Sequence, residues 1–436
     1  MKPITLALLL ASTCAVAQSP SVTKNIMDYS RECSGLKSPV CHESFSKAIG
    51  DAKSFLSKHG DQTYTISIPA GTFDFSEEPH ANADAGIIRA QAAIALADIA
   101  PKDGGRLIIQ GAGKDKTTLI TSDHIEGIHG DHVSHITIAG ITFARPHIDV
   151  TQGVIVDATH AGQLTVDVPD GFPAPASIFS PGNENGTYIR VFTNAPDPQL
   201  VLTATNSQIS WGASGVPKAA GPGAGGSHRW IIYFNKPDQM PGPDYLPGQL
   251  ACIKSKNSGQ AYMFSDGPGG GSDIVFDDIR WTQESRGAFK GGIVGIKILN
   301  SEVDRPPAIH GQQFCLSTPD GGPQIGQPGS LPTHGNLVDN YTADHTGDDS
   351  LAFFGDDSVA GTPNASIVRN VKINNSFARE ILMADTCSVT VTNADIKGCG
   401  PELPECPVTH LNGACGVPWG KHKQQTEKLQ QQLKKQ

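Results

Sequence analysis

Short runs in which apolar and polar residues alternate recur along this chain, and each run predicts a β-strand. The clearest runs span residues 107–109, 136–143, 274–279, 294–300, 337–340, 371–377 and 389–396. Most of them bend at an Asn, Asp or Gly before another apolar residue, and 22 positions separate Ile274 from Ile296. That spacing suits one coil of a parallel solenoid, whose coils must stack because none can bury its inner face alone. The pattern therefore predicts an all-β fold, a right-handed parallel β-helix.

Asparagine recurs at the bends of these runs, at Asn300, Asn340, Asn375 and Asn393. Stacked amide side chains at such bends can bond from coil to coil, so we expect an asparagine ladder. An antiparallel sandwich would also give many short strands. This chain has few of the Asn-Gly hairpin signals that a sandwich would favour, and the recurring Asn-containing unit therefore supports the parallel arrangement.

The two departures from the repeat predict a capping helix and an inserted domain. Apolar residues between Glu43 and Leu56 recur at helical spacing, and His59-Gly60 ends the pattern. We expect this helix to cover the open end of the β-helix. Residues 87–99 fit either a helix or buried strands. Between residues 151 and 249 the repeat gives way to separate strands joined by Pro- and Gly-rich loops, which predicts a small antiparallel β barrel.

The chain is thus divided into five predicted segments. They are a signal peptide (1–17), the cap and first coils (18–150), the inserted barrel (151–250), the main β-helix with the candidate site (251–415) and a polar tail (416–436). Lys2, an apolar run from Leu6 to Leu10 and Ala15-Val16-Ala17 are typical of a cleaved secretory signal. No later stretch approaches the roughly 20 apolar residues that span a membrane. We expect a secreted or periplasmic protein after signal removal.

Charge and cysteine content narrow the range of partners. The 33 basic and 43 acidic residues give a net charge of −10, which argues against nucleic acid or an anionic membrane as a partner. Without Cys14 of the signal, the cysteine number is even and fits disulfides in an oxidising compartment. The close groups Cys33/Cys41 and Cys399/Cys406/Cys415 predict staples near the two ends. Histidines at metal-finger spacing are missing beside them, so no metal site is predicted.

The strongest candidate for chemistry is the pair Asp348-Asp349, which follows Gly347 and opens a strand-like run. Paired carboxylates in an acidic, exported, Gly-rich protein indicate acid–base chemistry on a sugar bond. Strict alternation would place Asp348 outward with Ser350, and Asp349 inward with Leu351. Gly347 would permit a turn that brings both carboxylates to a cleft. The alternative is a turn in which the two aspartates cap backbone amides.

The stretch from Gly335 to Phe353, an Asn-bent coil leading into Gly-Asp-Asp and a strand, resembles the polygalacturonase-type glycosidases of the pectate-lyase-like β-helix superfamily. The wider layout, with a barrel inserted before an Asp-Asp coil, is similar to the β-helix α-1,3-galactosidases. The Gly-His-Gly and Arg-Ile-Lys signatures of polygalacturonases are missing after Asp349, which argues against a galacturonide substrate. The resemblance implies a carbohydrate substrate, no cofactor, and hydrolysis with inversion by two carboxylates about 6.5–9.5 Å apart.

Further site residues follow from the presumed stacking. Either Asp348 or Asp349 is the general base or the general acid, and a third carboxylate is Asp320, one coil earlier, or Asp344. Because Arg379-Glu380 follows the Asn bend of the next coil, stacking should bring it near the pair. Six polar residues on the presumed same face are candidates for binding sugar hydroxyls: His310, Gln313, His334, His345, Arg379 and Glu380.

Two other functions stay open. A β-helix polysaccharide lyase would use Lys297 or Arg379 as its base, with acid pairs holding calcium as a cofactor. Elimination by a lyase leaves an ultraviolet-absorbing unsaturated end, which hydrolysis does not. A non-catalytic carbohydrate-binding or adhesive β-helix would bind glycans without turning them over.

Overall fold

The computed structural model describes residues 21–33, 39–76, 92–102, 104–121, 126–146, 148–178, 187–201, 209–210, 217–234, 241–255, 262–265, 271–283, 287–289, 292–327, 331–386, 388–397 and 409–411. The predicted signal peptide and polar tail lie outside these ranges. The described part is mostly β-strand, with helices α1 (Pro39–Lys58) and α2 (Pro175–Ile178) and the short 3-10 turns η1 (Ile26–Asp28) and η4 (Ala224–Gly226). No helix in this part is long and apolar enough to cross a membrane.

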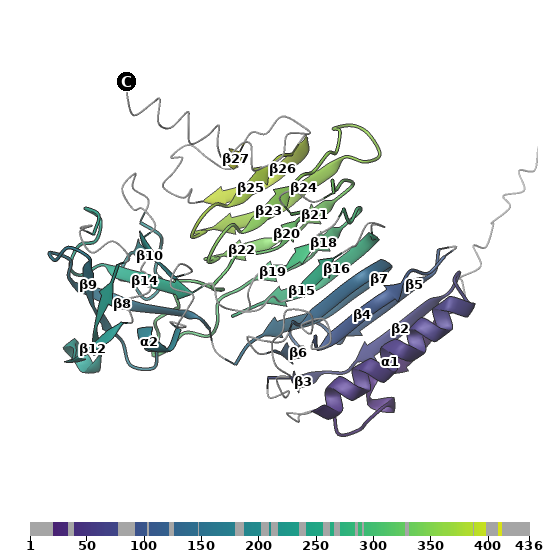
Figure 1. Cartoon of the computed structure of the whole chain (residues 1–436), viewed down its shortest axis with the longest axis horizontal. Coiled ribbons are helices and arrows are strands. Elements are labelled where there is room, and N and C mark those ends of the chain that lie inside the picture. Colours follow the sequence, from purple (N-terminus) through teal and green to yellow (C-terminus); the bar gives the residue numbers. More distant parts are fainter. Residues whose placement is uncertain are drawn as a thin grey trace, which may run out of the picture.

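The predicted N-terminal helix is present as α1. Its buried Phe45 ring meets the edges of the Phe73 and Phe75 rings, with centroid distances of 6.4 and 5.7 Å. Figure 1 shows α1 lying along β2 (Thr63–Ile68) at the N-terminal end of a stack of strands. The helix therefore covers apolar side chains at that end, as its spacing of apolar residues predicts.

The strands on either side of the insertion pair in parallel and form three columns. The first column contains β1 (Ser21–Asn25), β2, β5 (Arg106–Gly111), β7 (Ile128–Ala144), β16 (Ser272–Trp281), β18 (Lys297–Leu299), β21 (Leu337–Asp339), β24 (Ser366–Asn374) and β26 (Val389–Lys397). The second contains β3 (Gly71–Asp74), β6 (Thr117–Ile120), β19 (Glu302–Val303) and β22 (Thr342–Asp344), with parts of β7, β16, β24 and β26. The third contains β4 (Ile94–Ile99), the start of β7, β15 (Tyr262–Ser265), β17 (Ala288–Phe289), β20 (Gln324–Ile325), β23 (Leu351–Phe354), β25 (Ile381–Ala384) and β27 (Thr409–Leu411).

The columns are held together by rows of inward-facing apolar side chains. One row consists of register partners that are all 0% exposed: Ile138, Phe276, Ile298, Val338 and Val368. Burying each such side chain stabilises the fold by roughly 1.5–3 kcal/mol. The runs at Ile274, Ile296 and Val371 therefore pair in parallel, as the repeat predicts. Of the ambiguous segment 87–99, the described end is a strand, β4.

An amide ladder forms at one bend of the coils, although not with all of the predicted residues. Six stacked bend positions have positive φ: Gly140, Asp278, Asn300, Asn340, Asn370 and Asn393. The Asn340 Nδ2 donates to Asn300 Oδ1 at 2.8 Å, and the Asn393 Nδ2 donates to Asn370 Oδ1 at 2.5 Å. Asn375 was predicted for this row, but it lies at the next bend and donates to Gln199 Oε1 at 2.9 Å.

The insertion forms a seven-stranded antiparallel sheet, which Figure 1 shows to one side of the parallel strands. Its order is β11-β10-β14-β8-β9-β13-β12, with bounds β8 (Val150–Asp157), β9 (Gln163–Val168), β10 (Thr187–Phe192), β11 (Ile209–Ser210), β12 (Lys218–Pro222), β13 (His228–Tyr233) and β14 (Leu250–Ser255). This sheet has its own buried core, centred on Val166, Ile189 and Ile253. The pairings of its described strands do not join β11 to β12, so closure into a barrel stays a prediction.

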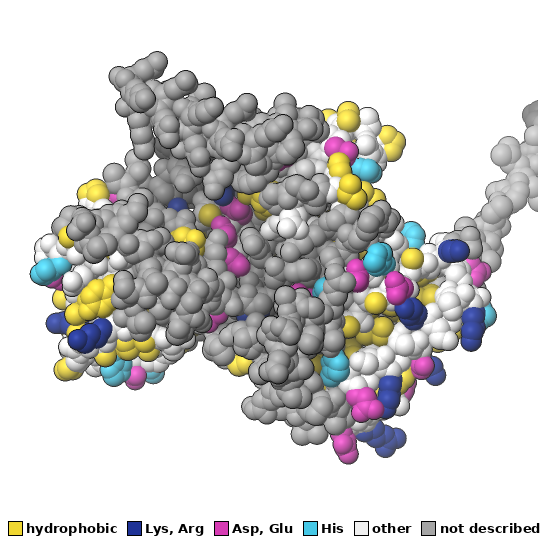
Figure 2. Space-filling view, in the orientation of Figure 1, with side chains coloured by type: hydrophobic (Ala, Val, Ile, Leu, Met, Phe, Trp, Pro, Cys, Tyr) yellow, Lys and Arg dark blue, Asp and Glu magenta, His cyan; other side chains and the backbone are white. Residues whose placement is uncertain are grey.

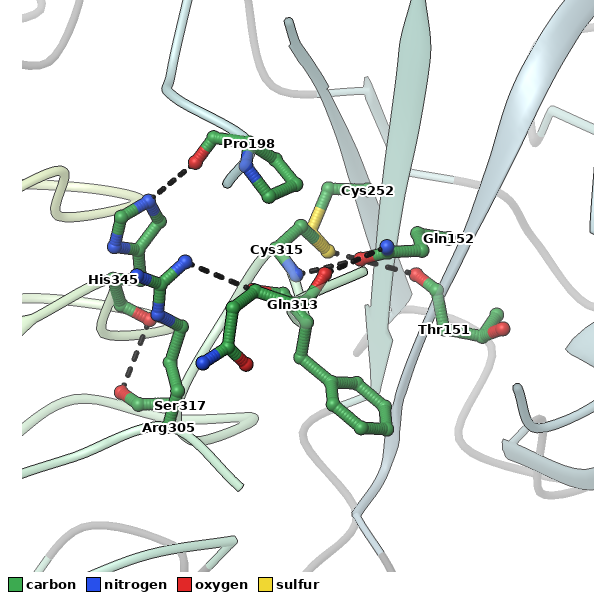
Figure 3. Close-up of a disulfide and its surroundings, with 10 residues drawn as sticks. Thr151, Gln152, Pro198, Cys252, Arg305, Gln313, Cys315, Ser317 and His345 are labelled. Atoms are coloured by element: carbon green, nitrogen blue, oxygen red, sulfur yellow. Dashed lines mark hydrogen bonds between the residues drawn. A yellow bond between two sulfur atoms is a disulfide. The ribbon is translucent and has the colours of Figure 1, made fainter. Parts of the chain in front are cut away.

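Two disulfides join described cysteines. Cys33–Cys41 staples the N-terminal end as predicted, next to the start of α1. Cys252–Cys315 was not predicted and connects β14 of the antiparallel sheet to a segment of the coils (Figure 3). The cysteines that remain after the signal peptide lie outside the described residues: Cys387, Cys399, Cys406 and Cys415.

The amide ladder gives a first prediction. Asn340 has a φ of 54°, a conformation that costs an Ala residue roughly 1–2 kcal/mol. We expect Asn340→Ala to lower the free energy of unfolding by about 2–3 kcal/mol, since it also loses the side-chain hydrogen bonds. Asn340→Gly loses the same bonds without the backbone strain and should cost less. Urea denaturation of both variants tests this, and equal losses would contradict a role for the left-handed backbone.

Candidate active site

Asp348 and Asp349 lie in a bend between β22 and β23, and both side chains are partly exposed. The predicted alternation is wrong here, because Ser350 is fully buried. Its hydroxyl lies 2.7 Å from Thr346 Oγ1 and 2.6 Å from Ser376 Oγ. Strand pairing begins at Leu351, so the residues before it do not follow the strand's in-and-out order. The bend turns both carboxylates away from the apolar interior.

Gly347 lies in a bend, and it is also required for the close approach of two coils. Its φ lies outside the left-handed region. A Cβ at this position would collide with the carbonyl oxygens of Thr318 and Pro319 in the preceding coil. The Gly347 N–H instead donates to the Asp320 carbonyl at 2.9 Å. The glycine therefore lets the acid-bearing bend sit directly on the coil that carries Asp320.

Stacking brings Asp320 to the acid pair. Extending the β20–β23 register toward the N-terminus places Asp320 opposite Asp348, and the Gly322 N–H donates to the Asp349 carbonyl at 2.9 Å. The Asp320 residue is 6% exposed. Acidic residues from two successive coils are therefore backbone neighbours at one corner. We call Asp320, Asp348 and Asp349 the acid corner.

The next coil adds a cation to the acid corner, as stacking predicts. The Ser350 N–H donates to the Arg379 carbonyl at 2.9 Å, which fixes the register. The Arg379 Nη1 donates to Asp349 Oδ1 at 3.1 Å. Glu380 follows, opposite Ser350, and is 1% exposed. Arg379 therefore reaches the acid pair directly, whereas Glu380 is buried behind it.

Asp344, the other candidate for a third carboxylate, is engaged elsewhere. Its oxygens lie 3.1 Å from Arg305 Nη2 and 2.8 Å from His345 Nδ1. Burial alone would raise the pKa of the Asp344 carboxyl, but the hydrogen bond and charge of His345, with the charge of Arg305, hold that pKa below its usual value. These contacts direct the Asp344 carboxylate toward Arg305 and His345 and not toward Asp348 and Asp349, so we do not place Asp344 in the acid corner.

His345 is also structural. It is 1% exposed, and its Nε2 donates to the Pro198 carbonyl at 2.6 Å (Figure 3). Its ring also stacks on Phe192. Pro198 and Phe192 belong to the inserted region, so His345 fastens that region to the coils. A buried ring with these partners does not reach a sugar, and we leave it out of the proposed site.

The structure places the remaining predicted sugar-binding residues at three separate locations. His334 lies at the other corner of the coil, where its Nδ1 is 3.1 Å from Asp357 Oδ1. His310 lines a cavity of about 430 Å³ between β8, β9 and the turn at residues 309–312. Gln313 lies at the junction with the insertion, where its N–H donates to the Pro196 carbonyl at 2.8 Å. None of these contacts joins them to the acid corner.

Lys254 is the residue near the acid corner that sequence reasoning missed. It comes from β14 of the antiparallel sheet, is 0% exposed, and its Nζ donates to the Gly347 carbonyl. The nitrogen also lies 4.7 Å from the Phe377 ring centroid and 5.4 Å from that of Tyr188. A charged residue at the end of the apolar run Leu250–Ile253 was the signal that could have found it.

Figure 2 shows Asp and Glu side chains gathered where the antiparallel sheet meets the parallel strands. In the part of the chain that the structure describes, no group of three or more His, Cys, Asp or Glu side chains is arranged to hold a metal ion. What the acid corner offers chemically is carboxylates to transfer protons and a guanidinium to hold one of them ionised.

Comparisons with known proteins add little to this geometry. No protein-family model matches the chain, and no curated protein matches it. Among solved structures, the Agl-KA catalytic domain is 12% identical with a TM-score of 0.37, and the match covers 91% of this chain and 50% of that one. The Azotobacter vinelandii mannuronan C-5 epimerase AlgE6 A-module is 11% identical with a TM-score of 0.26, covering 90% of this chain and 99% of that one.

A GH87 alpha-1,3-glucanase catalytic domain in complex with nigerose is also similar, at 11% identity and a TM-score of 0.26, with 90% of this chain and 60% of that one covered. This chain therefore spans about half the length of the Agl-KA catalytic domain and three fifths of the glucanase domain. At these TM-scores we draw no conclusion about this chain from the similarities.

The ion pairs of Asp344 predict a pH dependence of stability. Its folded-state pKa is depressed, so its contribution is complete above the unfolded value of about 3.9 and is lost as the pH falls through the lower, folded value. We expect Asp344→Asn to lower the unfolding free energy by about 1–3 kcal/mol at pH 7, because Arg305 and His345 lose their partner. Denaturation between pH 7 and pH 3 should show the difference from wild type shrinking toward acid.

The exposed Asp395 of β26 provides the matched control, since Asp395→Asn removes a carboxylate from the surface. A stability gap for Asp344→Asn that stayed constant across the pH range would contradict the assignment.

Proposed function

We propose that this chain is a secreted or periplasmic glycoside hydrolase that cleaves a poly- or oligosaccharide by carboxylate acid–base catalysis. The observation that carries the proposal is the pair of coil-to-coil hydrogen bonds, Gly347 N–H to Asp320 O and Gly322 N–H to Asp349 O, both 2.9 Å. They hold the backbones of acidic residues from two coils together at one corner, where Arg379 bonds to Asp349. The two disulfides support an oxidising destination.

The architecture that we propose for this enzyme is a right-handed parallel β-helix with an inserted antiparallel barrel. Three columns of parallel strands with one continuous apolar interior support the β-helix. The antiparallel sheet between residues 150 and 255 has a core distinct from that of the coils, completed by Phe314, Cys315, Leu316 and Phe377, which supports an inserted domain packed against the coils. The acid corner then lies on the coils beside the insertion, and both contribute walls to the site.

Hydrolysis of a glycosidic bond needs one carboxylic acid to protonate the leaving oxygen and one carboxylate to act on the opposite side of the sugar. The guanidinium bonded to Asp349 favours the ionised form of that carboxyl, so we assign Asp349 as general base. It would remove a proton from the water that attacks the anomeric carbon. In the same step Asp348 or Asp320, in its protonated form, donates its own proton to the leaving oxygen. With a water between acid and base, the anomeric configuration inverts.

Substitution of the acids tests the proposal. Each of Asp348→Asn, Asp349→Asn and Asp320→Asn keeps the side-chain shape and removes a titrating group. We expect the variant of the base and that of the acid to lose about 10²–10⁴-fold in kcat/KM. The assay follows new reducing ends on a glycan panel. If all three variants keep wild-type rates, the active site lies elsewhere.

The leaving group distinguishes acid from base. A sugar with an activated leaving group needs no protonation, so the general-acid variant should recover most of its rate on such a substrate, whereas Asp349→Asn should not. Asp277→Asn is the matched control, because Asp277 accepts a bond from Asn300 at an ordinary bend. Asp356 is unsuitable as a control, since it is 0% exposed and accepts a bond from Asn336.

A lyase remains the second candidate, because Arg379 lies beside the acid pair and a lyase needs such a base at its cleft. The sequence also suggested Lys297 as a lyase base. This lysine lies on β18, and its Nζ is 3.2 Å from Asp273 Oδ1, so it is paired away from the acid corner. An absorbing unsaturated product end would support the lyase. Saturable glycan binding with no new reducing ends would support the non-catalytic alternative.

A further inference from the structure

Lys254 is an unusual residue because its long charged side chain is completely buried. Moving an ammonium group out of water costs several kcal/mol even after the protein relaxes. Strand β14 could bury an apolar residue here at no such cost, and Ile253 beside it does so. The charge therefore has to be offset by nearby groups, and those groups show what the lysine does.

The contacts of Lys254 converge on the bend that carries the acids. Its Nζ donates to the carbonyl of Gly347, in the peptide unit that also contains the Asp348 N–H. The face of Phe377 lies 4.7 Å away, and the Phe377 N–H donates to the Thr346 carbonyl at 2.8 Å. Lys254 thus binds the backbone of the acid-bearing bend from the side of the inserted sheet. The Phe377 ring stabilises the charge of the ammonium group.

A second buried cation lies beside it. Arg190 of β10 is 3% exposed, and its guanidinium carbon lies 5.1 Å from the same Phe377 ring. The other ionisable groups on the elements packed around Lys254 are Tyr188 of β10, Asp149 before β8, Asp157 at the end of β8, and Asp320, His345, Asp348, Asp349, Arg379 and Glu380 of the coils. Two buried cations favour the ionised form of carboxyl groups near them.

The strand that carries Lys254 is fixed in place. Two residues before the lysine, Cys252 is joined to Cys315, whose N–H also donates to Gln152 Oε1 at 2.6 Å (Figure 3). From Cys315 the chain continues through Ser317 to Asp320 of the acid corner. The disulfide therefore joins the strand of the cation to the segment of an acid, so neither can shift alone.

We propose that Lys254 is a positioning residue of the acid corner: its buried ammonium holds the Gly347 carbonyl and favours the ionised form of Asp349, the general base on this bend. The inference rests on the proposed function for its catalytic meaning. If Lys254 has this role, the inserted sheet contributes to the function of the acid corner, because the buried ammonium group comes from β14 and not from the coils.

The activity test uses three substitutions that separate charge from shape. Lys254→Met removes the charge and the donor, Lys254→Gln keeps a donor for Gly347, and Lys254→Arg keeps the charge. We expect the acidic limb of the kcat/KM profile to move up by about one pH unit or more in the Met and Gln variants, because loss of a nearby cation makes a carboxyl easier to protonate. The Arg variant should keep the limb near its wild-type position.

Lys297→Met is the matched control, since Lys297 pairs with Asp273 away from the acid corner. If Lys254 is purely structural, its substitution should lower the rate or the melting temperature without moving the acidic limb of the kcat/KM profile. That result in both the Met and the Gln variants would overturn the proposal.

A measurement without substrate keeps this inference separate from the proposed function. Carbon-13 NMR of aspartate carboxyl groups should show Asp349 titrating at higher pH in Lys254→Gln than in wild type, whether or not the protein hydrolyses a glycan. If the variants fail to fold, NMR of the lysine Cε in the wild-type protein still reports whether Lys254 is charged. A charged Lys254 at pH 7 supports the proposal, and a neutral amine there overturns it.

Discussion

Parallel backbone hydrogen bonding between neighbouring coils is the interaction on which the rest of this structure depends. It sets which residue of one coil lies over which residue of the next, and it does so along the whole stack. The partnership of Gln324 with Ala352, and of Leu351 with Ile381, determines that Asp320, Asp349 and Arg379 meet. Residues far apart in sequence lie at one corner because the register between the strands determines which residues of successive coils are neighbours.

The inserted sheet depends on the same coils for its position. Arg305 lies between Asp197 of the insertion and Asp344 of the coils, at 2.7 and 3.1 Å. Beside it the His345 ring bonds to Pro198, and Asn375 bonds to Gln199. His345 lies at the bend that follows β22, immediately before the bend with the acids, and Asn375 lies at the stacked bend that follows β24. Paired charges with several hydrogen bonds hold one geometry, which is what a site between two folding units requires.

The sequence predicts the parts of this fold that repeat. Alternating apolar residues located most strands, the helical spacing located α1, and coil stacking brought Arg379 to Asp349, because each depends on a regular period. Where the period stops, the predictions were wrong. Ser350 is buried by its hydroxyl partners before the strand begins, and Asn370, not Asn375, continues the amide row because the coil bends twice.

Contacts between distant segments were beyond sequence reasoning for a different reason. Asp344 and His345 are close to the acid pair in sequence. In the structure, however, the His345 ring bonds to Pro198 of the insertion and Asp344 bonds to His345. Lys254 carried a usable signal, a charge after four apolar residues, but its target is 93 residues further along the chain. No local pattern encodes that pairing, because it depends on how the inserted sheet rests on the coils.

The close packing of the coils explains why a cation for the acid corner comes from the insertion. Gly321, Gly322 and Gly347 line the contact between the two acid-bearing coils, and a Cβ on any of them would collide with a neighbouring carbonyl. This contact has no room for a side chain that could neutralise or orient the carboxylates. Stacking therefore supplies no cation between these two coils, and the Arg379 guanidinium reaches Asp349 from the coil on the other side. A lysine entering from β14 reaches the backbone of the bend without separating the coils, so the tight stacking and the buried charge are two parts of one arrangement.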